Sequence, residues 1–163
     1  MSIVKILSIA IGAMLLASAA QAQAPQTEHN VSMGMSLAII AGALEQCTKD
    51  GYKVSITIVD KAGLVAASVR GDGTNPHTME FSRMKAYTAR TRGQTSLEFM
   101  QASSTPEGAL LRQIPGTVAI GGGVPIKMGT ETIGAVGVSG APGGDKDEVC
   151  SKAGIDKVAD QLK

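Results

Sequence analysis

The chain has 163 residues, a formal net charge of +1 at neutral pH, no Trp, two Phe and two Tyr. This length corresponds to one domain with its own core, and so few aromatic residues mean that aliphatic side chains and Met must fill that core. A nearly neutral chain lacks the electrostatic surface typical of proteins that bind nucleic acids or anionic lipids, so these partners are not expected.

Residues 1–22 have the pattern of a signal peptide. Lys5 precedes an apolar run over 6–20, which closes with Ala20-Gln21-Ala22, a small-x-small cleavage pattern. The run is short for a membrane-spanning helix, so export with cleavage is favoured over an uncleaved anchor. We expect a mature chain that begins near Gln23, lies in a periplasm or outside the cell, and does not associate with the membrane.

The polar segment 23–31 is predicted to be a disordered lead-in, in which nothing holds His29, and 32–163 to form a single domain. Ser32 can cap a first helix that runs to about Asp50. The apolar stripe of this helix comprises Met33, Leu37, Ile40, Leu44 and Cys47.

Five strands are expected. The first two flank Asp60-Lys61-Ala62-Gly63, where alternating apolar and polar residues predict a β-hairpin. The five predicted strands are Val54–Val59, Leu64–Val69, Thr117–Ile120, Pro125–Met128 and Thr132–Val138. Because helices and strands do not alternate as βαβ units, the fold class is α+β, with a five-stranded antiparallel sheet flanked by helices.

The remaining helices are predicted from their start signals. Asn75 and Pro76 indicate the N-cap and first position of a second helix that extends to about Arg92. The capping box Thr95–Glu98 predicts a short helix, and Thr105-Pro106 predicts another.

The only two cysteines are Cys47 and Cys150. Cys47 lies on the stripe of the first helix, and Cys150 lies in the first turn of the last helix, which begins at Asp145 or Asp147. An oxidising compartment favours a disulfide between them, and two separate buried thiols are the alternative. Two cysteines with no neighbouring histidine do not complete a zinc site.

Two segments are unusual in composition: Asn75–Ala89 (NPHTMEFSRMKAYTA) and the glycine-rich Gly121–Cys150 (GGGVPIKMGTETIGAVGVSGAPGGDKDEVC). Together with the hairpin VSITIVDKAGLVAASVR they resemble the GlcG/HbpS family, the small haem-binding-protein-like domain also found at the end of PduO proteins. The resemblance covers nearly all of the chain after residue 22. It implies the same α+β sheet, and it implies a homo-oligomer, because members of the family often form larger assemblies, octamers among them.

His77 is the candidate ligand for a haem iron. It follows Pro76 at a helix start, which fixes the position of its side chain, and neutral imidazole ligates haem iron. A surface histidine that ends a loop is the alternative. Tyr87 is the next candidate for the iron ligand. The thioether sulfurs of Met79, Met84 and Met128 are further candidates, although Met more often fills a hydrophobic core.

Two cations on the second predicted helix are candidates for holding a haem propionate or another carboxylate. Arg83 is one, although with Glu80 at i, i+3 it can also form a solvated ion pair. Lys85 is the other, and it opens the Lys-Ala-Tyr-Thr-Ala run that the family resemblance places here.

The glycines allow two roles. Gly122 and Gly123, like the segment 139–144, flank predicted strand ends and are expected at the rim of a ligand pocket. Gly134 and Gly137 are expected to allow close packing of strands or subunits. The strand–GxGxxG–helix context of a dinucleotide site and the Gly-Lys-Ser/Thr of a P-loop are both missing.

No catalytic residues are predicted, because Ser139 is not in a nucleophile elbow and no ordered His–Asp pair is apparent. The function expected first is an exported small-ligand-binding protein, most simply one that binds haem or a related tetrapyrrole. Two alternatives stay open. One is an enzyme or enzyme accessory acting on a 2-hydroxy acid or a corrinoid, as the resemblance to GlcG and PduO implies. The other is an oligomeric interaction scaffold.

Overall fold

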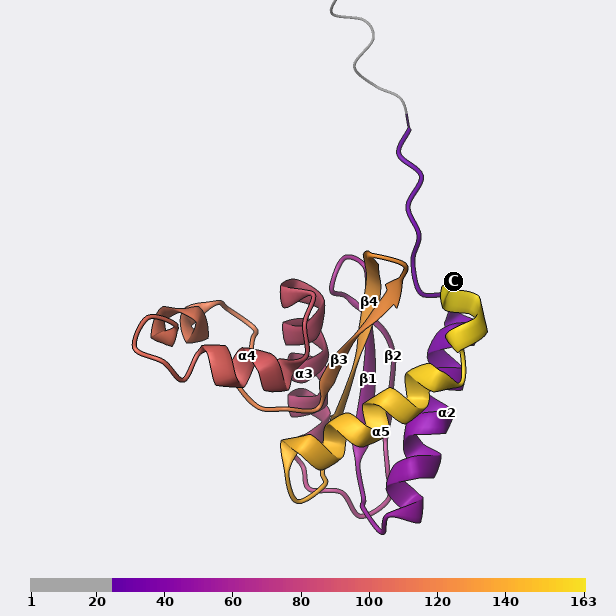
Figure 1. Ribbon diagram of the computed structural model, residues 1–163. Helices are drawn as coiled ribbons and strands as arrows, with labels where there is room; N and C mark the ends of the chain where they lie inside the picture. The colour runs from indigo at the N-terminus through magenta and orange to yellow at the C-terminus, as the bar shows by residue number, and fades with distance from the viewer. Residues whose placement is uncertain (1–24) are drawn as a thin grey trace, which may run out of the picture.

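The computed structural model describes residues 25–163, so the predicted signal peptide, residues 1–22, lies outside the described residues. In chain order the elements are α2 (Met33–Lys49), β1 (Ser55–Asp60), β2 (Val65–Arg70), α3 (Thr78–Arg92), α4 (Ser96–Ala102), η2 (Ala109–Gln113), β3 (Gly123–Met128), β4 (Glu131–Ser139), α5 (Gly144–Asp156) and η3 (Ala159–Leu162). Figure 1 shows α2 and α5 side by side, and the α4–η2 segment projecting from the body. No helix within 25–163 is long and apolar enough to span a bilayer.

The sheet has four strands in the order β2-β1-β4-β3, and each neighbouring pair is antiparallel. The α+β class is confirmed, but the prediction of a fifth strand at Thr117–Ile120 is wrong. The Val118 amide donates to the Thr88 hydroxyl over 2.9 Å; this hydroxyl donates to the Met84 carbonyl over 2.8 Å and lies 3.4 Å from the Val118 carbonyl. A helix side chain therefore accepts the hydrogen bond from the Val118 amide that a neighbouring strand would have accepted.

One face of the sheet carries the hydrophobic core under α2 and α5. The buried residues of this core include Ile39, Ala43 and Cys47 from α2, Ile56 and Ile58 from β1, Val136 and Val138 from β4, and Cys150 from α5. The predicted stripe of the first helix is wrong at Met33 and Leu37, which are 59% and 56% exposed. The predicted disulfide is present, because the sulfurs of Cys47 and Cys150 are bonded and their Cα atoms lie 5.5 Å apart.

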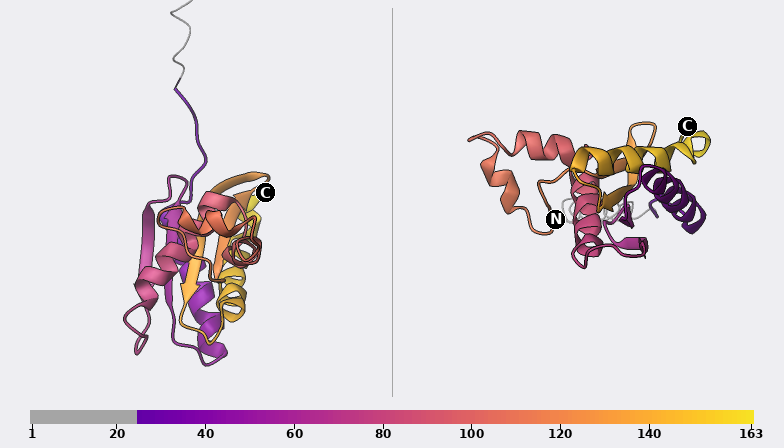
Figure 2. Two further views of the ribbon diagram at one scale, coloured as in Figure 1. Left: turned by 90° about the vertical axis from the view of Figure 1, so that its left-hand side faces the viewer. Right: turned by 90° about the horizontal axis from the view of Figure 1, so that it is seen from below.

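The other face of the sheet packs against α3 through small and hydroxylated side chains. Ser55 and Thr78 share a hydrogen bond of 2.8 Å, and so do Thr57 and Ser82. A Cβ on Gly137 would lie 2.1 Å from the Ser82 carbonyl oxygen, so the missing side chain is what lets α3 approach the sheet. Figure 2 shows α3 on the side of the sheet away from α2 and α5.

The residues just before α2 contact the tips of both hairpins. The His29 Nδ1 and Glu131 Oε2 atoms lie 2.9 Å apart, and the Lys61 ammonium donates to Glu131 over 2.5 Å. The Asn30 side-chain oxygen accepts from the Lys61 amide over 3.0 Å. The expectation that nothing holds His29 is therefore wrong.

Helix start signals were predicted correctly at α2 and α4 but not at α3, η2 and α5; the helix predicted to start at Thr105-Pro106 begins at Ala109, after a turn. Ser32 caps α2, and Thr95 and Glu98 form the capping box of α4. The second predicted helix begins later than expected, at Thr78 with His77 as N-cap, because the Asn75 carbonyl accepts from the Thr78 amide in a turn. The last begins at Gly144, before either predicted aspartate.

Candidate functional site

Lys85, a predicted ligand-binding cation, lies in the interior. Its ammonium donates to Asp147 Oδ2 over 2.7 Å and to the Val138 carbonyl over 3.1 Å, and both side chains of the ion pair are almost fully buried. The other carboxylate oxygen of Asp147 accepts from the Ala141 amide over 3.0 Å. Lys85 therefore links α3 to β4 and α5, Asp147 also holds the loop before α5, and the Lys85 ammonium is not presented to solvent.

Burial dominates the electrostatics of this pair. Removal from water lowers the pKa of the Lys85 ammonium and raises the pKa of the Asp147 carboxyl, and the attraction between the two groups opposes both shifts. Asp147 was expected to be a helix cap, so its role as the partner of Lys85 was missed. The available signal was the lysine itself, which shares a helical face with Ser82 and Ala89 and needs a counter-charge when that face is buried.

Gly122 and Gly123 pack over this ion pair instead of lining an open pocket. A Cβ on Gly122, whose φ is 118°, would lie 2.7 Å from the Asp147 Cβ and 3.1 Å from the Lys85 ammonium nitrogen. A Cβ on Gly123 would lie 2.1 Å from the Lys85 carbonyl oxygen. Both glycines are buried, so their predicted place at a pocket rim is wrong. The segment 139–144 was also predicted at a pocket rim, and two of its residues, Gly140 and Pro142, do line a hollow.

His77 lies at the N-terminal end of α3 with its side chain exposed to solvent. Its ring meets the Phe81 ring edge-on, with 5.4 Å between the centroids and 86° between the planes. Met84 follows at i+7, so His77, Phe81 and Met84 form a stripe that we call the outer face of α3. No hydrogen bond to another described residue occupies either ring nitrogen of His77, so the imidazole is available to a ligand.

Arg83 lines a hollow of about 390 Å³ beside α3. The floor includes Thr57, Val65 and Ser68 from β1 and β2, and Pro76 and Met79 lie at its side. The predicted pair with Glu80 is confirmed, with Arg83 donating to the carboxylate over 2.7 and 3.0 Å. These hydrogen bonds lower the pKa of Glu80 and raise that of Arg83.

Tyr87, the second predicted iron ligand, is half-buried between two turns. Its ring packs against the backbone of Gly63 and Gly116, where a Cβ would approach the ring to 3.0 and 3.2 Å. The structure thus separates the predicted site residues. His77 and Arg83 lie at the surface of α3, Tyr87 packs between Gly63 and Gly116, and Lys85 is buried.

Comparison with known proteins assigns the fold to a family. Residues 31–156 match the family model described as "Haem degrading protein HbpS-like". The chain is 32% identical to Protein GlcG of Escherichia coli (strain K12) over 114 residues, which cover 70% of this chain and 84% of GlcG. A crystal structure of a double mutant of Streptomyces reticuli HbpS is 30% identical, with a TM-score of 0.78 over 83% of this chain and 90% of that one.

A more distant structure, the PduOC:heme complex, is 21% identical, with a TM-score of 0.71 over 78% of this chain and 94% of that one, and shows the shared fold. The model match covers most of the chain, and the four-stranded sheet with its flanking helices agrees with it. The protein therefore belongs to the HbpS-like family, which includes GlcG.

Proposed function

We propose that this protein is an exported ligand-binding protein that binds haem or a related tetrapyrrole, with His77 as the iron ligand. The family description names haem, and a structure with the same fold was solved with heme bound. The observation that carries the proposal is the exposed imidazole of His77, held at the start of α3 with no competing hydrogen bond among the described residues.

The outer face of α3 offers groups that suit a tetrapyrrole. The His77 ring is restrained by its edge-on contact with Phe81, and half-buried Phe81 and Met84 provide apolar surface beside it. Arg83, beside the neighbouring hollow of α3, is the candidate partner for a propionate, and it would have to exchange its contact with Glu80. Haem would supply the iron, and the residues of α3 would bind and orient it.

Export and assembly are part of the proposal. The disulfide between Cys47 and Cys150 supports an oxidising compartment, because such bonds rarely persist in a reducing cytosol. Self-association is proposed from the resemblance to a family whose members often form larger assemblies; Leu110 and Leu64, 71% and 67% exposed, are apolar side chains that an interface could cover. N-terminal sequencing of the protein from a periplasmic fraction and light scattering of the purified protein test these two points.

Haem binding is tested by titrating haemin into the purified protein and following the Soret absorbance. We expect saturation at one haem per chain and a band that is lost or shifted in His77→Ala. His29→Ala is the matched control, since it removes the other histidine of the described chain and should leave the band unchanged. A response that never saturates in the native protein would contradict the proposal.

A further inference from the structure

A hollow of about 550 Å³ opens at the end of the sheet where β1 begins and β2 ends. The C-terminal part of α2, the segment from Gly51 to Val54 and the loop after Arg70 surround it. None of its lining residues belongs to the outer face of α3. A ligand in this hollow would therefore occupy a site separate from the one proposed for haem.

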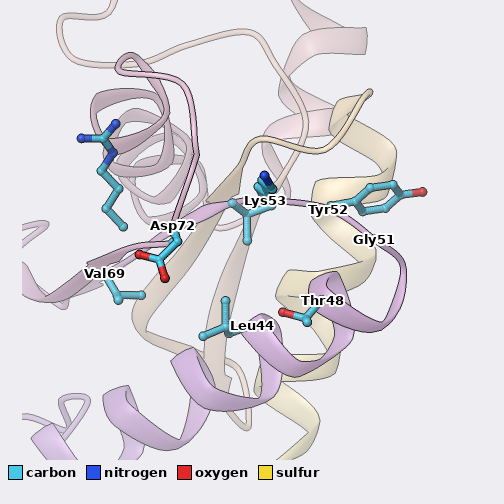
Figure 3. A pocket seen from close by; sticks show the side chains of 10 residues that line it. Leu44, Thr48, Gly51, Tyr52, Lys53, Val69 and Asp72 are labelled. Carbon is cyan, nitrogen blue, oxygen red and sulfur yellow. The ribbon is translucent and has the colours of Figure 1, made fainter.

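The hollow has an apolar floor. The floor is formed by Leu44 of α2, by Val69 of β2 and by Val54, which directly precedes β1 and is fully buried. Figure 3 shows the Thr48 hydroxyl turned toward the space above Leu44, while the Tyr52 ring points away from it. A volume of this size with an apolar base is typical of small-molecule sites, which span roughly 300–1,000 Å³.

Two oppositely charged side chains, Asp72 and Lys53, line the hollow and form no ion pair among the described residues. The Asp72 carboxylate turns toward the hollow in Figure 3. The Lys53 ammonium lies at the edge that this hollow shares with a neighbouring one, 3.0 Å from where a Cβ on Gly73 would be. Within residues 25–163 neither group lies within 4.0 Å of an opposite charge, including each other. Arg70 also lines the hollow, but its guanidinium already donates to Thr74.

We propose that this hollow binds a small zwitterion with an aliphatic body, such as an apolar amino acid. The ligand's ammonium group pairs with Asp72, its carboxylate pairs with Lys53, and its aliphatic part covers Leu44 and Val69. A ligand with only one charge leaves one rim group unpaired, so it binds more weakly.

The test is a titration of the purified protein with L-leucine and with ε-aminocaproate, two aliphatic zwitterions with different charge separations. Backbone amide shifts in the NMR spectrum report binding. We expect saturable shifts over 51–54 and 71–73 with at least one zwitterion. Isocaproate and isoamylamine, which each lack one charge, should bind about tenfold more weakly.

Variants locate the site. Lys53→Gln and Asp72→Asn should each weaken zwitterion binding about tenfold. Lys127→Gln and Asp156→Asn are matched controls, since both side chains are exposed and lie outside the hollow, and they should bind as the native protein does. The proposal is overturned if neither zwitterion gives saturable shifts, if isocaproate binds as tightly as leucine, or if the control variants lose as much affinity. Haemin binding does not enter this experiment, so either proposal can fail without the other.

Discussion

The ammonium of Lys85 and the carboxylate of Asp147 lie 2.7 Å apart inside the molecule, although 62 residues separate them in the chain. Lys85 belongs to the helix on one face of the sheet, and Asp147 belongs to a helix on the other. Asp147 also accepts from the Ala141 amide, so the pair fixes both helices to the loop that starts α5.

Removing one member of this pair should destabilise the fold strongly. Lys85→Met leaves the Asp147 charge buried without its partner, and we expect the free energy of unfolding to fall by about 3–5 kcal/mol. Urea denaturation measures the change, with the exposed Lys127→Met as control. The double variant Lys85→Met/Asp147→Leu should recover most of the loss, since it leaves no unpaired charge. A single variant as stable as the control would contradict the role of the pair.

Two glycines should respond in opposite directions to alanine. Gly137→Ala places a Cβ 2.1 Å from the Ser82 carbonyl oxygen, which must push α3 away from the sheet, at a cost of about 1–3 kcal/mol. In Gly34→Ala the new Cβ meets nothing closer than the Ser32 hydroxyl oxygen at 3.9 Å. Within α2 this change should stabilise by about 0.5–1 kcal/mol. Thermal unfolding of both variants measures whether the melting temperature falls in Gly137→Ala and rises in Gly34→Ala. Equal changes in melting temperature would be inconsistent with close packing at Gly137.

The disulfide should contribute a large part of the stability. It joins residues separated by 103 positions, and closing a loop of this length in the unfolded chain corresponds to about 4–5 kcal/mol. The variant with both Cys47→Ala and Cys150→Ala should therefore unfold at a much lower urea concentration than the oxidised protein. Adding a reductant should shift the native protein in the same direction and leave the variant unchanged. Identical midpoints for the oxidised protein and the variant would argue against the bond.

The contact at the hairpin tips should depend on pH. Hydrogen bonds from Lys61 and His29 hold the pKa of Glu131 below its usual range, and Glu28 is the other acid near Lys61. A lowered pKa means that the ionised carboxylate stabilises the folded state above the unfolded-state pKa, and that this stabilisation disappears as the pH falls through the lowered value. Glu131→Gln should thus be less stable than the native protein at neutral pH, and the difference should shrink as the pH falls below about 4.3, the unfolded-state pKa of Glu. A difference that stays constant over this range would rule out the charge as its cause.

Local signals in the sequence predicted most of the fold. Ser32 and the capping box of α4 act through contacts within a few residues, so their roles could be predicted from the chain. The segment Thr117–Ile120 has a strand-like composition, but its partner is the Thr88 hydroxyl on a helix, and composition does not specify the partner.

The candidate sites were predicted less completely, because they depend on contacts between distant segments. His77 was found from its place after Pro76, a local feature. The burial of Lys85 follows from a carboxylate 62 residues away, and the hollow beside Asp72 combines a helix end, a strand start and a loop. No spacing within any one of these segments specifies where the others lie.

The central claim is that the imidazole of His77 binds haem iron, and chemical rescue tests it most directly. His77→Gly removes the imidazole but keeps a residue that is tolerated at a helix N-cap. The variant is titrated with haemin, with and without free imidazole, and the Soret band is compared with that of the native protein. We predict a saturable native band, its loss in the variant, and its return when imidazole is added. A band in the variant that matches the native one without imidazole would contradict the assignment of His77 as the ligand.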